Sequence, residues 1–93
     1  MRVLKYPIPR NPNEYGVYPL TIPTNAKVLS AALVGGEVVI YAMVPSQEVP
    51  DREIAVAMAG TGKPMPEEMT SGWQFLGTVK QEQFVWHVFI KDR

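Results

Sequence analysis

The sequence predicts an all-β fold: a single small domain of about seven short, mostly antiparallel strands that form a sandwich or a partly open barrel. Nine prolines and seven glycines divide the 93 residues into pieces too short for ordinary helices. No stretch keeps apolar residues at helical spacing long enough to predict a helix. The pieces are rich in Val, Ile, Tyr, Phe and Trp, which favour a pleated sheet. A chain of this length has room for one core, so we expect residues 1–93 to form one domain.

The first two strands are predicted at Val3–Tyr6 and Val17–Ile22. Pro7 and the proline two residues later end the first strand, and the Asn- and Pro-rich stretch that follows is expected to be a loop. Pro19 lies inside the second strand. Because proline has no N–H to donate to a β-ladder, this strand must lie at a sheet edge or contain a bulge.

The next two strands, Val28–Val34 and Glu37–Val44, flank the pair Gly35-Gly36. Two glycines between two β-prone runs predict a tight hairpin, because the favoured hairpin turns need positive φ. The second run, EVVIYAMV, is apolar almost throughout. This pattern is typical of a central strand that is covered on both faces or lies partly in an interface.

Three more strands are predicted at Glu53–Met58, Trp73–Lys80 and Phe84–Ile90. Alternation of side chains along each strand separates a core face from an opposite face. The predicted core-facing residues are Ile54, Val56 and Met58 in the first, Trp73, Phe75 and Val79 in the second, and Phe84, Trp86, Val88 and Ile90 in the third.

The charge balance and the absence of cysteine exclude several classes of function. Nine Lys and Arg residues match nine Asp and Glu residues, so the formal net charge is zero. A DNA or RNA polymer is therefore not an expected partner, and self-association is not opposed, so we expect a homo-oligomer. Without cysteine there is no disulfide and no thiolate metal site. We find no signal peptide and no apolar stretch of membrane-spanning length, so we expect a cytoplasmic protein without a membrane partner.

Residues 59–66, AGTGKPMP, raise the question of a phosphate-binding loop. A nucleotide P-loop needs a glycine, four residues, and then Gly-Lys-Ser/Thr. Here Ala57 stands at the position of the first glycine and Pro64 follows the lysine, so the pattern fails. Two interpretations remain open: a plain connection between strands, or a nest of backbone N–H groups that binds an anion beside a lysine. The nest would consist of Gly60, Thr61, Gly62 and Lys63.

His87 is the only histidine in the chain. A metal site or a catalytic triad would need carboxylates or a serine placed beside it, and the sequence shows neither at a useful spacing. We therefore predict no metal, no cofactor and no catalysis. His87 is either a half-buried strand residue or a ligand contact. Arg10, Arg52 and Tyr15 are further candidates for ligand binding, because guanidinium and aromatic groups stack on planar ligands.

Five segments carry a family resemblance: LKYPI, LTIPTNAKVLSA, IYAMV, GTGKPMP and FLGTVKQEQFVWHVF. In this order they resemble an uncharacterised family of small proteins, of about this length, from tailed phages and prophages. The matching segments cover most of the chain, although the loop between Tyr6 and Val17 is longer than in the usual pattern. No established activity comes with this family.

The resemblance implies an accessory role in an infected cell, in the host cytoplasm if the protein is phage-encoded. One expectation is a binding protein that counters host antiviral defence by sequestering a nucleotide immune signal in a pocket, often between subunits. The alternative is an interaction module that inhibits or redirects a host or phage protein through a strand edge or an apolar patch. An enzyme that acts on a nucleotide is a third, less favoured interpretation, because a single histidine offers few catalytic groups.

Overall fold

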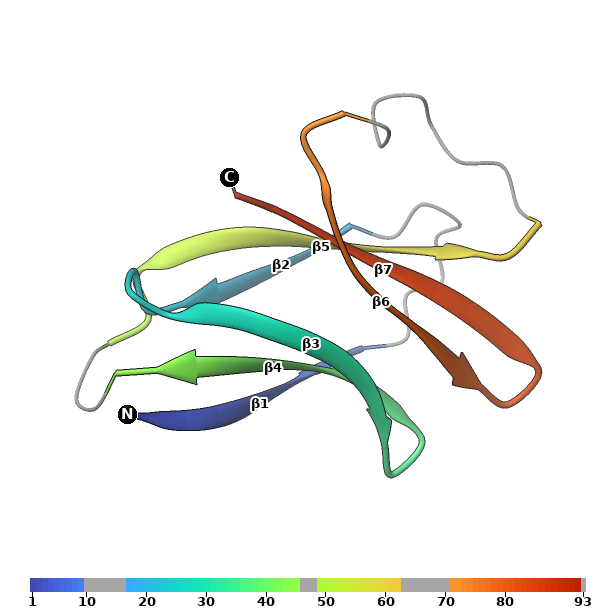
Figure 1. The fold of residues 1–93 in the computed structure, drawn as a ribbon, viewed down its shortest axis with the longest axis horizontal. Coiled ribbons are helices and arrows are strands. Elements are labelled where there is room, and N and C mark those ends of the chain that lie inside the picture. Colours follow the sequence, from blue (N-terminus) through green and yellow to red (C-terminus); the bar gives the residue numbers. More distant parts are fainter. Residues whose placement is uncertain (10–16, 46–48, 63–70, 93) are drawn as a thin grey trace.

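A computed structural model describes residues 1–9, 17–45, 49–62 and 71–92. These residues form seven strands and no helix (Figure 1), which confirms the predicted all-β class. The strands are β1 (Arg2–Ile8), β2 (Val17–Ile22), β3 (Lys27–Val34), β4 (Glu37–Val44), β5 (Arg52–Gly60), β6 (Gln74–Gln81) and β7 (Phe84–Asp92). Across the described stretches we find no apolar helix of membrane-spanning length.

The strands form two antiparallel sheets. Sheet A has the order β1-β4-β3, and sheet B has the order β2-β5-β7-β6. The apolar strand β4 is central in sheet A, as its sequence predicts. Strand β3 packs against β6 without forming a ladder with it, and a Cβ placed on Gly77 would lie 3.9 Å from the backbone of Ala31. The fold is therefore a sandwich whose sheets approach each other closely at the β3–β6 corner and do not close into a barrel.

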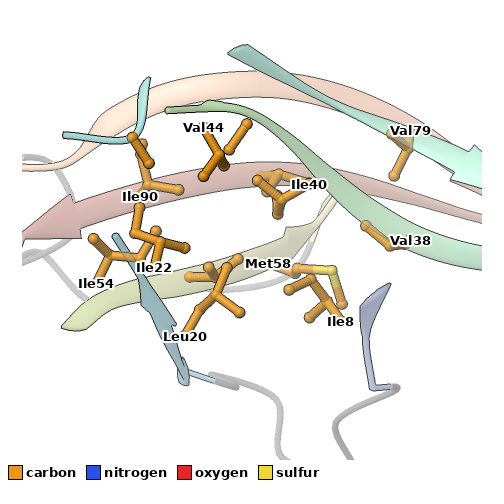
Figure 2. Close-up of a cluster of buried hydrophobic side chains, with 14 residues drawn as sticks. Ile8, Leu20, Ile22, Val38, Ile40, Val44, Ile54, Met58, Val79 and Ile90 are labelled. Atoms are coloured by element: carbon orange, nitrogen blue, oxygen red, sulfur yellow. The ribbon is translucent and has the colours of Figure 1, made fainter. Parts of the chain in front are cut away.

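The core lies between the two sheets, where alternate residues of the strands meet (Figure 2). Ile22 of β2, Ile40 of β4, Val56 of β5 and Val88 of β7 are completely buried. Burial of one such side chain contributes about 1.5–3 kcal/mol to folding. The core face predicted for β5 is confirmed, because its alternate residues Ile54, Val56 and Met58 all belong to the core. In β7 the prediction holds for Val88 and Ile90, which are buried, and for Trp86, which packs against the core. It is wrong for Phe84, which is 43% exposed at the start of the strand.

Each of the four edge strands contains a feature that hinders pairing with a further strand. Strands β1 and β2 contain Pro7 and Pro19, and β3 and β6 each contain a register shift. The prediction that Pro19 lies in an edge strand is confirmed. The predicted end of the first strand at Pro7 is wrong, because β1 continues through Pro7 to Ile8. An edge strand tolerates proline, since the missing N–H is not needed on its unpaired side.

The register shift in β6 corrects one predicted core face. Phe75 pairs with Phe89 and Gly77 pairs with Val88, so one additional residue lies between them. As a result Phe75 is 56% exposed on the outer face of sheet B, whereas Val79 is buried in the core. The prediction that both lie on the core face is wrong for Phe75, because alternation of period two does not survive a bulge.

The two hairpins at the same end of the sandwich are connected by one side chain. Gly35 and Gly36 both have positive φ, 58° and 81°, which confirms the predicted β3–β4 hairpin. In the β6–β7 hairpin, Gln81 is buried. Its amide nitrogen donates to the carbonyl of Gly36 at 2.9 Å, and its amide oxygen accepts from the indole N–H of Trp86 at 3.1 Å. Gln81 thereby joins sheet B to the turn of sheet A.

Candidate functional site

The structure separates the ligand-binding residues that the sequence predicts. Gly60 is the last residue of β5 and pairs with Trp86, and Thr61 and Gly62 form the turn that follows. These residues meet His87 at one corner of sheet B. Arg52 is the first residue of β5, so about 26 Å of extended strand lies between it and Gly60. Arg10, Tyr15 and Lys63 lie outside the described residues.

His87 lies on the outer face of sheet B between two threonines. Its ring Nε2 is 2.7 Å from the hydroxyl of Thr61, and its Nδ1 is 3.0 Å from the hydroxyl of Thr78 on β6. A neutral imidazole has one N–H and one bare nitrogen. One threonine hydroxyl therefore accepts a hydrogen bond from the ring, and the other donates one to it. Both ring nitrogens are satisfied within the protein.

This corner is less well suited to binding an anion than the sequence suggests. The backbone N–H of Thr61 donates to the carbonyl of Val85 at 3.1 Å, so it is not available to an anion. Gly62 has a φ of 80°, and a side chain added there would meet no atom within 4 Å. The glycine is thus explained by the turn geometry alone. Among the described residues, both hydrogen-bond partners of His87 are threonine hydroxyls, and neither is the carboxylate that orients the histidine of a catalytic triad.

At the opposite end of β5, Arg52 holds the connection between the two sheets. Its Nη1 donates to the carbonyl of Thr24 at 3.1 Å, and its Nη2 donates to the carbonyl of Ala26 at 3.2 Å. The neighbouring Asp51 accepts two hydrogen bonds of 2.7 Å from the backbone N–H and the hydroxyl of Thr24. These contacts fix the turn at residues 23–26, where the chain passes from sheet B to sheet A.

Arg52 also lines an open cleft between the sheets. The cleft has a volume of ≈ 360 Å³, which lies within the range of about 300–1,000 Å³ found for small-molecule sites. Residues of β3, β5, β6 and β7 line it. Its apolar lining includes Val28, Ile54 and Ile90. The core strands thus provide an apolar surface in a cleft that opens to solvent.

The polar lining of the cleft is predominantly cationic. Its charged residues are Lys27, Arg52, Lys91 and Asp92, three cations and one anion. Arg52 and Asp92 lie on the inner face of sheet B, because they pair with the core residues Ile22 and Ile54. Lys27 and Lys91 pair with Met43 and Ala55 on the outer faces, so the two lysines border the cleft. Asp92 lies 3.6 Å from Nε of Arg52, close enough for an ion pair but too far for a hydrogen bond. That Nε atom is buried and has no hydrogen-bond partner. Gln74 adds an uncharged amide to the lining.

Sequence reasoning found only one of these cleft residues, Arg52. It missed Lys27 at the start of β3 and the pair Lys91 and Asp92 at the end of β7, which are far from Lys27 in the chain. The ammonium of Lys91 lies 5.9 Å from the ring centroid of Trp73, a distance at which a cation is attracted to an aromatic face. No signal in the sequence links these residues before the strand order is known.

The described part of the chain contains no group of three His, Asp or Glu residues placed to hold a metal ion. The cleft therefore offers recognition by charge, hydrogen bonds and apolar contact. Its cations are suited to an anionic group, and its lining of Val and Ile is suited to an apolar or planar body.

Comparisons with known proteins place the chain in a family. No curated protein and no solved structure matches it. A family model described as a domain of unknown function, DUF7352, matches residues 1–93. Since the match extends over the whole sequence, the chain belongs to the DUF7352 family.

Proposed function

We propose that this protein binds a small ligand of nucleotide type in the cleft between its sheets and does not transform it. The observation that carries this proposal is the cleft, whose lining combines Arg52 with an apolar surface and is bordered by Lys27 and Lys91. Nucleotides present the matching chemistry, since an anionic phosphate is attached to a largely planar body. Among the sequence-predicted contacts that the structure describes, Arg52 lines the cleft, whereas Gly60, Thr61, Gly62 and His87 do not.

The described side chains support binding without catalysis. Both ring nitrogens of His87 are bonded to threonine hydroxyls, and neither partner is an acid that would orient the ring. Efficient proton transfer needs a base within reach of the substrate. His87 is not part of the cleft lining, and the single carboxylate there, Asp92, faces Arg52. Holding the ligand is the function that this arrangement supports best.

The biological setting of this proposal comes from the sequence resemblance. A small accessory protein of phage type would act in the host cytoplasm, where sequestering a nucleotide immune signal would counter antiviral defence. A sequestering protein needs affinity and a closed pocket rather than reactive groups. An open cleft would become closed if a second copy covered it, which agrees with the proposed homo-oligomer.

Calorimetric titration of the full chain with a panel of cyclic and ADP-ribose-type nucleotides tests the proposal. We expect heat of binding with at least one of them, no product, and a retained ligand in native mass spectrometry of the purified protein. The Lys91→Ala variant should weaken binding, whereas Lys63→Ala should weaken it only if the GTGK segment is the site. Absence of heat across the panel together with absence of a retained ligand would contradict the proposal, and turnover would contradict binding without catalysis.

A second candidate function, a protein-interaction module, is favoured by an apolar surface on the outer face of sheet B. Phe75 is 56% exposed there, its ring contacts that of Phe89 edge to face at 5.5 Å, and Val17 on the same face is 42% exposed. Addition of a strand at a sheet edge is disfavoured, because all four edges contain a proline or a bulge. A stoichiometric partner that is lost in Phe75→Gln and retained in Lys91→Ala would support this function over ligand binding.

A further inference from the structure

We infer that the inner wall of the cleft, where the lining side chains point toward the core, binds the amino-bearing edge of adenine or cytosine through Gln74 and Asp92. In both bases an exocyclic amino group stands beside a ring nitrogen that accepts a hydrogen bond. The inference rests on the proposed function, because it specifies which bases a ligand of nucleotide type would carry.

The polar groups of the inner wall can be placed from the strand pairing. Gln74 of β6 pairs with Ile90 of β7, and Asp92 of β7 pairs with Ile54 of β5. Ile54 and Ile90 belong to the core, and residues directly opposite each other in an antiparallel ladder share a face of the sheet. Gln74 and Asp92 therefore both point inward, and both line the cleft. They are diagonal neighbours across β6 and β7, so their Cα atoms lie about 7–8 Å apart.

The side-chain amide of Gln74 has no hydrogen-bond partner within the described part of the chain. An amide offers a carbonyl acceptor and an NH₂ donor side by side. The carbonyl can accept from an amino group while the NH₂ donates to the neighbouring ring nitrogen, which is the two-bond pairing by which glutamine recognises adenine. The amide of Gln81, by contrast, is bonded at both ends within the protein. Gln74 is thus available to a ligand.

Asp92 supplies a second acceptor, and Arg52 holds it in position. A carboxylate oxygen of Asp92 lies 3.6 Å from Nε of Arg52, whose two terminal nitrogens are fixed by carbonyls of the 23–26 turn. The Asp92 side chain is 76% exposed, so its oxygens can accept the second hydrogen of an amino group that is bonded to Gln74. The inner wall carries one positive and one negative charge, which suits a neutral polar edge better than a further anion.

Beside these polar groups lies an apolar surface on which a flat ring can rest. Ile54 and Ile90 are neighbours at one end of the core (Figure 2), and both line the cleft together with Val28 of β3. A ring that covers these side chains excludes water from the hydrogen bonds at its edge. Hydrogen bonds are stronger in such surroundings than in water. The cleft therefore combines an apolar contact for the ring with polar contacts for its edge.

The arrangement distinguishes an amino group from a carbonyl at the same position of the ring. Hypoxanthine and uracil carry an oxygen where adenine and cytosine carry the amino group. The amide of Gln74 can turn over to match this reversed edge, but the carboxylate of Asp92 cannot donate and would face an acceptor. A site that hydrogen-bonds a ligand N–H group rejects an analogue without it, because polar groups of the site are left unpaired. The discrimination thus depends on Asp92.

Calorimetric titration of the full chain with adenosine, inosine, cytidine and uridine tests the inference. We expect each amino-bearing nucleoside that binds to do so at least tenfold more tightly than its carbonyl counterpart. Gln74→Met keeps the length of the side chain and removes the amide, so it should weaken adenosine binding by about tenfold. Gln83→Met makes the same change in the exposed β6–β7 turn, outside the cleft lining, and should leave all affinities unchanged.

The Asp92→Asn variant gives the most specific result. An asparagine amide can donate as well as accept, so adenosine should bind less tightly than to the wild type and inosine more tightly. The ratio of the two affinities should therefore fall toward one. A ratio that stays at its wild-type value in Asp92→Asn, with unchanged thermal unfolding, would overturn the role given to Asp92.

The outcomes separate this inference from the proposed function. Equal affinity of the wild type for adenosine and inosine would overturn the inference and leave nucleotide binding in the cleft intact. A preference for adenosine with no further gain from adenosine 5′-monophosphate would support the inference and refute a nucleotide-type ligand in favour of a nucleoside. Absence of binding by all four nucleosides, in a protein whose thermal unfolding is intact, would refute the inference, whereas the nucleotide panel decides the proposed function separately.

Discussion

Replacing Gln81 by methionine should destabilise the sandwich at the end where its two hairpins meet. The side chain is buried, and it bonds to the carbonyl of Gly36 and to the indole N–H of Trp86. Methionine has a similar length and can fill the same space, but it cannot replace either hydrogen bond. The substitution therefore removes the polar link between the sheets while keeping most of the apolar contact.

The expected magnitude follows from the exposure of the two groups that lose their partner. An unsatisfied group that is fully buried costs about 1–3 kcal/mol. Gly36 is exposed and Trp86 is half-buried, so water can reach both in part and the lower end of that range applies to each. We expect a loss of about 2 kcal/mol in the free energy of unfolding. For a domain of this size that corresponds to a decrease in Tm of about 8–16 °C.

Urea and thermal unfolding, followed by circular dichroism, measure this loss. Gln83→Met is the matched control, because Gln83 lies exposed in the adjacent turn and its replacement should change stability by less than about 0.5 kcal/mol. A double-mutant cycle with Trp86→Phe isolates the bond to the indole, for which we expect a coupling of about 1 kcal/mol. If Gln81→Met is as stable as Gln83→Met, the link between the hairpins contributes nothing and the reasoning is refuted.

Two further substitutions test the β3–β4 turn and the histidine corner. Gly35 has a φ of 58° with open space around it, so Gly35→Ala should cost about 1–2 kcal/mol from backbone conformation alone. Gly35→Asn should cost clearly less, because asparagine tolerates positive φ, and equal urea midpoints for the two variants would contradict this reasoning. Thr61→Val removes the hydroxyl that lies 2.7 Å from Nε2 of His87 and should cost about 0.5–1 kcal/mol. It should also shift the tautomer balance of His87 in ¹⁵N NMR spectra, whereas Thr21→Val, on the exposed part of β2, should change neither quantity.

The number of strands, their approximate positions and most of their core faces could be predicted from the sequence. These properties depend on neighbouring residues: alternation with period two, breaks at proline and glycine, and the Gly35-Gly36 turn. The prediction was wrong for Phe84, which is exposed at the start of β7. It was also wrong at Pro7, which β1 passes through, and at Phe75, which the bulge turns outward. The last two errors have the same origin, since the tolerance of a proline or an additional residue depends on which side of a strand is paired.

The sequence by itself determined that this chain forms strands and where its tight hairpin lies. Only the tertiary structure decided which strands are neighbours, and the candidate site depends on that choice. Lys27, Arg52 and Lys91 belong to three different strands, and they line one cleft because β3, β5 and β7 meet at one end of the sandwich. The pairing of distant strands is set by burial of the whole core, and no local pattern encodes it. For the same reason the contact of His87 with Thr61 and Thr78 was not predictable, whereas the presence of a lone histidine on a strand was.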